Sequence, residues 1–173
     1  MKHRSMVESS LAFLLALFAA IPAARAADYS LDGGAVHFAA PDAWTVLMEK
    51  QDGDPQFLAF QVRDPASSGD TLARITVSTQ HASDLAAFQQ FVNDGIAKAR
   101  RLPGYLGAGQ GGADSAMRYT ATENKRKTAY FERYYYHNGI GIQVRCVRPD
   151  AGNPQWNATF DAGCQAIATA VSH

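Results

Sequence analysis

The dipeptide Asn138-Gly139 is the feature that most limits how this chain can fold. It separates two segments of strand-like composition, residues 130–137 and 140–148. Asn-Gly strongly favours a type I′ turn, because both central residues of that turn need positive φ. If the turn has two residues, every cross-strand pair follows from counting residues outward from it. Since side chains alternate along a strand, the count also predicts which residues share a face of the hairpin.

The first hairpin face is mostly apolar and places Phe131 opposite Cys146. Asn153-Pro154 supplies a helix start, with an N-cap followed by proline in the first turn. Apolar residues then recur at spacings of three and four, as in an amphipathic helix: Trp156, Phe160, Cys164, Ile167 and Val171. Both cysteines therefore point into one helix–sheet interface. We expect a structural disulfide between Cys146 and Cys164 that joins the last strand to the last helix.

The second hairpin face carries alternate tyrosines. Its members are Tyr130, Glu132, Tyr134 and Tyr136 on the first strand, with Arg145 opposite Glu132 as a cross-strand ion pair. One interpretation is a surface for a protein partner, because rigid aromatic side chains with polar tips are favoured in recognition. The other is that a helix or loop covers this face and leaves the hydroxyls at its edge. The sequence leaves both open.

The remaining elements are read from periodicity and from turn residues. Strands are expected at residues 36–38, 45–49, 57–63, 72–80 and 117–122, with another over 128–136. A helix is expected over residues 84–101, capped by Ser83 and ended by Pro103-Gly104. Residues 28–34 are polar and glycine-rich and predict a flexible entry; residues 107–112 predict a flexible connector. Beyond residue 26, the chain has a length that suits one domain, residues 27–173.

Residues 1–26 have the pattern of a cleavable secretory signal peptide. A basic start is followed by an apolar run, residues 11–21, then by Pro22 and by Ala24-Arg25-Ala26. The run is too short to cross a hydrocarbon core, which takes about 20 residues. We expect cleavage before Ala27 and a periplasmic or secreted protein with no transmembrane segment in its mature part. An oxidising compartment would also allow the cysteines to pair.

Charge and motifs argue against several functions. The whole chain has 16 basic and 16 acidic side chains. Without the signal peptide the net charge is about −2, and so balanced a charge argues against a nucleic-acid partner. The histidines lie on separate predicted elements, so no metal site is expected. No G-x-S-x-G elbow is present, and no Lys-Ser or Lys-Thr follows the glycines of residues 107–112. We therefore expect no cofactor, no catalytic residues and no enzymatic activity.

Residues 38–44 carry the run F-x-x-P-x-x-W, which includes Pro41 and Trp44. With the order of elements over residues 36–171, this run resembles the PsbP-like fold, including the periplasmic DcrB-like proteins. The resemblance implies an α+β fold with a central antiparallel β-sheet flanked by helices, an α/β/α sandwich. It also implies a role in binding or assembly, and it offers no catalytic residues.

These observations favour an exported, non-enzymatic binding protein that recognises a protein partner in an immunity, adaptor or accessory role. The alternate tyrosines and the missing catalytic motifs motivate this hypothesis. A periplasmic carrier of a small ligand, with a pocket between sheet and helix, is the alternative. An unrecognised hydrolase has the least support.

Overall fold

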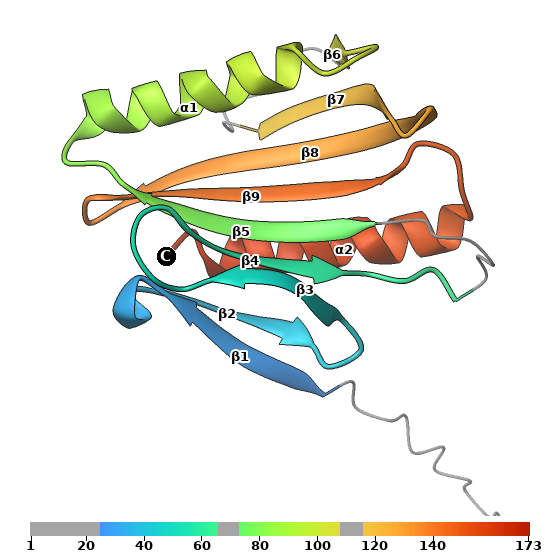
Figure 1. The fold of residues 1–173 in the computed structure, drawn as a ribbon. Helices are drawn as coiled ribbons and strands as arrows, with labels where there is room; N and C mark the ends of the chain where they lie inside the picture. The colour runs from blue at the N-terminus through green and yellow to red at the C-terminus, as the bar shows by residue number, and fades with distance from the viewer. Residues whose placement is uncertain (1–24, 66–72, 108–115) are drawn as a thin grey trace, which may run out of the picture.

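The computed structural model describes residues 25–65, 73–107 and 116–173 of the chain (Figure 1). These residues form two antiparallel sheets, two α-helices and one short 3-10 helix. In chain order the elements are β1 (Ala26–Leu31), η1 (Asp32–Gly34), β2 (Val36–Pro41), β3 (Thr45–Lys50), β4 (Gln56–Gln61), β5 (Arg74–His81), α1 (Leu85–Arg100), β6 (Leu106–Gly107), β7 (Ala116–Glu123), β8 (Arg126–His137), β9 (Ile140–Pro149) and α2 (Pro154–Ala170). The α+β class expected from the sequence is confirmed.

The larger sheet has seven strands in the order β3-β4-β5-β9-β8-β7-β6, and each neighbouring pair is antiparallel. The smaller sheet is the β1–β2 hairpin. The connection through α1 carries the chain from β5 to the far edge of the large sheet, and β7, β8 and β9 then return strand by strand (Figure 1). The longest strands, β8 and β9, therefore lie in the middle of the sheet.

The β8–β9 hairpin has the predicted register. Asn138 and Gly139 form the turn with φ of 47° and 82°. Phe131 pairs with Cys146, and Glu132 pairs with Arg145, as counting from the turn predicts. The local preference of Asn-Gly for positive φ was enough to determine this pairing.

The disulfide is also confirmed. Cys146 on β9 and Cys164 on α2 are bonded, and each is 2% exposed. The two residues are 18 positions apart, and closing a loop of that length stabilises the fold by about 3 kcal/mol in the chain-entropy model. The bond fastens α2 to the centre of the sheet.

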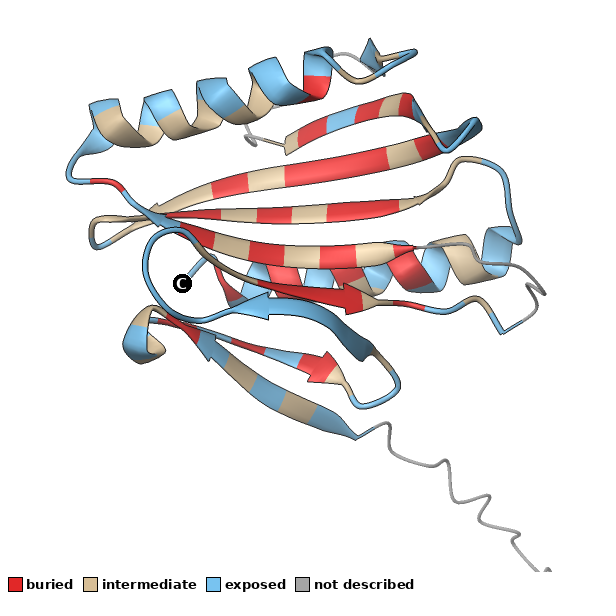
Figure 2. Cartoon of the chain, viewed as in Figure 1, coloured by how far each residue is buried: buried red, intermediate tan, exposed pale blue. Residues whose placement is uncertain are grey.

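The two helices lie on opposite faces of the large sheet. Phe160 and Ile167 of α2 pack with Phe60 of β4, and the β1–β2 hairpin closes the same core with Phe38. On the other face, α1 packs against β8 and β9. Along β5 the buried residues alternate with half-buried ones (Figure 2), as in a strand with one face in the main core. The layers are therefore helix, sheet and helix.

Two predictions at the start of elements were wrong. Residues 28–31 of the predicted flexible entry belong to strand β1, and each of them pairs with β2. Helix α1 is capped by Asp84, whose carboxylate accepts a hydrogen bond of 2.8 Å from the Ala87 N–H, and not by Ser83. Aspartate and serine cap helices about equally well, so neighbouring candidates cannot be separated by type.

Some predictions concern residues outside the described part of the chain. These predictions are the signal peptide, up to residue 24, and the glycine-rich connector at residues 108–112. In the described part, no helix has the length and apolar character needed to span a membrane.

Candidate functional site

A buried carboxylate, Glu132, lies on the α1 face of the sheet and is 2% exposed. Tyr119 of β7 and Tyr134 of β8 donate hydroxyl hydrogen bonds to it at 2.6 and 2.7 Å. The Gln143 side-chain amide on β9 donates a third at 2.9 Å, and the Arg145 Nε lies 3.0 Å from Oε1. We call these five residues the Glu132 cluster. Three adjacent strands thus satisfy one buried charge.

The electrostatics of the cluster favour protonated tyrosines. Burial, followed by the negative charge of Glu132, raises the pKa of both Tyr119 and Tyr134 well above the usual value for tyrosine. Burial is the largest single effect on the pKa of Arg145 and would lower it, but Glu132, Tyr119 and Tyr130 together outweigh burial and the net pKa is raised. At neutral pH the hydroxyls therefore act as hydrogen-bond donors to the carboxylate, and Arg145 stays charged.

Helix α1 covers the cluster closely because glycine occurs at two contact points. A Cβ at Gly95 of α1 would collide with the Tyr134 hydroxyl. A Cβ at Gly141 of β9 would lie 2.9 Å from Cδ1 of Phe91 on α1. The absence of side chains at these two positions lets the helix approach the sheet.

A small cavity of about 200 Å³ remains between α1 and the cluster. The charged groups that line it are Asp94 and Lys98 from α1 and Glu132 and Arg145 from the sheet. Typical small-molecule sites have about 300–1,000 Å³. This space suits water or a very small polar group, so we regard the Glu132 cluster chiefly as the anchor of α1.

The five residues predicted as a partner surface are mostly covered. Tyr130, Glu132 and Tyr134 are 4%, 2% and 3% exposed. Tyr136 and Arg145 are half-buried, and the Tyr136 ring lies 5.4 Å from that of Phe88 on α1. Of the two interpretations, a covered face agrees with the structure and an open aromatic surface does not. The predicted ion pair between Glu132 and Arg145 is present.

Tyr119 was missed by the sequence reasoning. It donates to Glu132 and stacks on Tyr130 with ring centroids 4.6 Å apart. It belongs to β7, and counting from the β8–β9 turn says nothing of that strand. The second turn at Asn124-Lys125, where φ is positive at both residues, could have placed Tyr119 opposite Tyr130.

A second feature is the free edge of the large sheet. Among the described strands, β4 alone pairs with β3, and each of the six residues of β3 is exposed. Three consecutive apolar side chains lie on this edge: Val46, Leu47 and Met48 are 37%, 43% and 57% exposed. Between Val46 and Met48 the register with β4 shifts, so Leu47 is a bulge residue. Such an edge presents unpaired backbone groups and apolar surface together.

The described residues contain no group of three or more His, Cys, Asp or Glu side chains placed to hold a metal ion. Cys146 and Cys164 form a disulfide with each other, so neither is a free thiol.

Comparison with known proteins gives distant structural likeness alone. No family model matches the chain, and no curated protein matches it. A Pseudomonas aeruginosa protein of unknown function, PA94, is 18% identical with a TM-score of 0.48, over 81% of this chain and 94% of that one. The Saccharomyces cerevisiae Ran-binding protein Mog1p is 15% identical with a TM-score of 0.49, over 86% and 93%.

A third similar structure is LpqN of Mycobacterium tuberculosis, which is involved in cell envelope biogenesis. It is 18% identical with a TM-score of 0.40, over 74% of this chain and 76% of that one. Because the TM-scores of all three structures are below 0.5, the likeness assigns neither a family nor a function to the chain. The resemblance to the PsbP-like fold therefore stays a prediction.

Proposed function

We propose that this chain is an exported, non-enzymatic binding protein that recognises another protein, in an immunity, adaptor or accessory role. The partner contributes an extended segment that pairs with β3 as an additional strand of the large sheet. The observation that carries this proposal is the exposed edge strand with its three apolar side chains, Val46, Leu47 and Met48. The proposal moves the partner surface from the covered tyrosine face to the sheet edge.

The physical argument concerns backbone groups as well as side chains. An edge strand has N–H and C=O groups directed away from its single neighbour, and an extended peptide can pair with them. Proteins usually protect such edges with charge, proline or a covering element. Along β3 the charged residues Glu49 and Lys50 stand at one end, and the middle of the strand is apolar. Large apolar side chains at such an edge would bury surface against the added strand.

Two observations support the exported location. The Cys146–Cys164 disulfide is of a kind that persists in oxidising compartments and is rare in reducing ones. The sequence of residues 1–26 has the order of features expected of a signal peptide. Mass spectrometry of the protein from its native compartment tests both features, because a free thiol or an uncleaved leader contradicts export.

The binding experiment begins with a photo-crosslinking amino acid at position 48 in the native envelope, followed by identification of the linked protein. The affinity of the purified partner is then measured for the parent, for Met48→Lys and for Leu85→Lys. Leu85 is a matched control, because it is an apolar residue on α1 that is 68% exposed. We expect Met48→Lys to weaken binding about tenfold or more, and Leu85→Lys to leave it unchanged.

Hydrogen exchange provides the readout specific to strand addition. Binding should slow exchange of the β3 amides, because they acquire hydrogen-bond partners. Equal affinity of Met48→Lys and the parent, or unchanged exchange throughout β3 in the complex, would overturn the proposal. Crosslinks from position 48 to lipid alone would do the same.

A further inference from the structure

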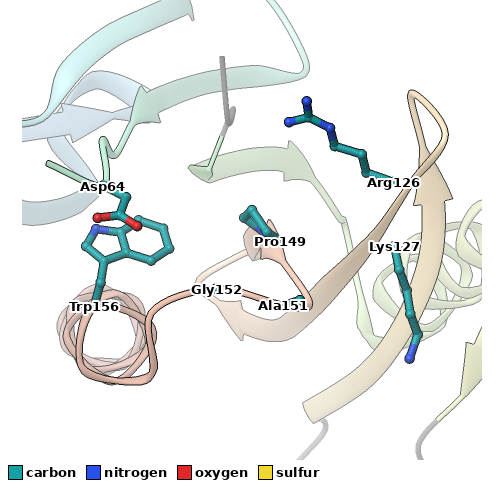
Figure 3. Close-up of a pocket in the computed structure, with 7 residues that line it drawn as sticks. All are labelled: Asp64, Arg126, Lys127, Pro149, Ala151, Gly152 and Trp156. Carbon is teal, nitrogen blue, oxygen red and sulfur yellow. The ribbon is translucent and has the colours of Figure 1, made fainter. Parts of the chain in front are cut away.

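A second cavity, of about 380 Å³, lies at the end of the sheet where the β7–β8 turn approaches the start of α2 (Figure 3). Pro149, Ala151 and Trp156 supply apolar walls, and Asp64 and Arg126 supply charge. Its size falls within the range of small-molecule sites, about 300–1,000 Å³. The cavity under α1, at about 200 Å³, does not reach that range.

The Trp156 ring forms a fixed flat wall. Its Nε1–H donates a hydrogen bond of 3.1 Å to the Arg63 carbonyl oxygen, and the ring packs against Phe160 with centroids 5.5 Å apart. The ring is therefore held in place from the protein side. A wall that is already ordered costs little conformational entropy when a ligand binds.

The charged groups around the cavity are not equivalent. Lys127 is paired with Asp150 at 2.8 Å, and in Figure 3 its side chain points away from Trp156. Arg126 extends from β8 towards the space above Pro149 (Figure 3), and among the described residues no carboxylate forms an ion pair with it. Asp64 lies beside Trp156 in the same view. An anionic group is therefore favoured at the Arg126 side of the cavity.

We propose that this cavity binds a small organic anion with a flat apolar body. The body lies against Trp156 and Pro149, and the anionic group accepts hydrogen bonds from the Arg126 guanidinium. Arginine suits this role because its planar fork matches a carboxylate in a bidentate pair. The site is separate from β3 and goes beyond the proposed protein binding, so either proposal can fail without the other.

The test uses the Trp156 indole N–H as a reporter in nuclear magnetic resonance. The chain has two tryptophans, so a Trp44→Phe variant assigns the Trp156 signal. The full-length mature protein is titrated with phenylacetate, phenethylamine and acetate. We expect saturable shifts of the Trp156 signal with phenylacetate, and none with the cation or with acetate, which lacks the apolar body.

Substitution at Arg126 supplies the second arm. Arg126→Gln should weaken phenylacetate binding about tenfold or more, and Arg126→Lys should restore part of it. Arg101→Gln, at an exposed residue that follows α1, is the matched control and should bind as the parent does. No saturable shift with phenylacetate, equal binding of phenethylamine, or undiminished binding by Arg126→Gln would overturn the proposal.

Discussion

Replacing Glu132 with glutamine tests whether the Glu132 cluster holds the α1 layer on the sheet. The amide has nearly the shape of the carboxylate but carries no charge and offers one acceptor oxygen in place of two. The Tyr119 and Tyr134 hydroxyls and the Arg145 guanidinium then lose a charged partner at 2.6–3.0 Å. The Glu132 side chain is 2% exposed, so bulk solvent has little access to the groups that lose their charged partner.

The magnitude follows from the partners. Removing one member of a buried ion pair costs about 3–5 kcal/mol. The Arg145 side chain is 34% exposed and can regain some hydration, which reduces the loss. We therefore expect Glu132→Gln to lower the free energy of unfolding by about 2–4 kcal/mol. Such a loss is a large part of the total free energy of unfolding of most domains, which is about 5–15 kcal/mol.

Urea unfolding followed by circular dichroism measures this change. Glu49→Gln is the control, because Glu49 is an exposed carboxylate on β3 and should shift stability by no more than about 0.5 kcal/mol. A double-mutant cycle with Arg145→Gln isolates the coupling between the two side chains. If Glu132→Gln destabilised the protein by less than about 1 kcal/mol, the cluster could not be the anchor that we infer.

Two further predictions concern the same layer. Gly95→Ala should gain about 1 kcal/mol of helix propensity, but its Cβ would lie 2.8 Å from the Tyr134 Cζ. Overpacking of this kind costs about 1–3 kcal/mol, so we expect net destabilisation in urea, and a more stable variant would contradict the tight contact. The raised pKa of Tyr119 and Tyr134 gives an alkaline dependence. A raised folded-state pKa gives stability that is complete below the usual tyrosine pKa, about 10, and decreases above it. The urea concentration at the unfolding midpoint should therefore decrease as the pH is raised beyond about 10. The decrease should be less steep for Tyr119→Phe than for the parent, and equal slopes would count against this explanation.

Much of the fold was predictable because local rules applied. Asn138-Gly139 determined the register of the central hairpin, and that register put Cys146 on the face that meets α2. The spacing of apolar residues likewise placed Cys164 on the inner side of the last helix. Each inference needed a short stretch of chain with a strong backbone or periodic preference.

The candidate sites were less predictable because they combine distant segments. The free edge at β3 depends on sheet order, since a strand's own residues do not say whether it has one neighbour or two. The cavity beside Trp156 combines Asp64, Arg126 and the β9–α2 loop, which approach one another only in the folded chain.

The sequence by itself therefore determined the hairpin pairing, the disulfide and the two faces on which side chains fall. Tertiary structure alone decided that the tyrosine face is covered. The tyrosines alternate as predicted, yet α1 packs over Tyr134 because Gly95 and Gly141 leave room for it. Burial depends on which element covers a surface, and the pattern along a single strand carries no information on that.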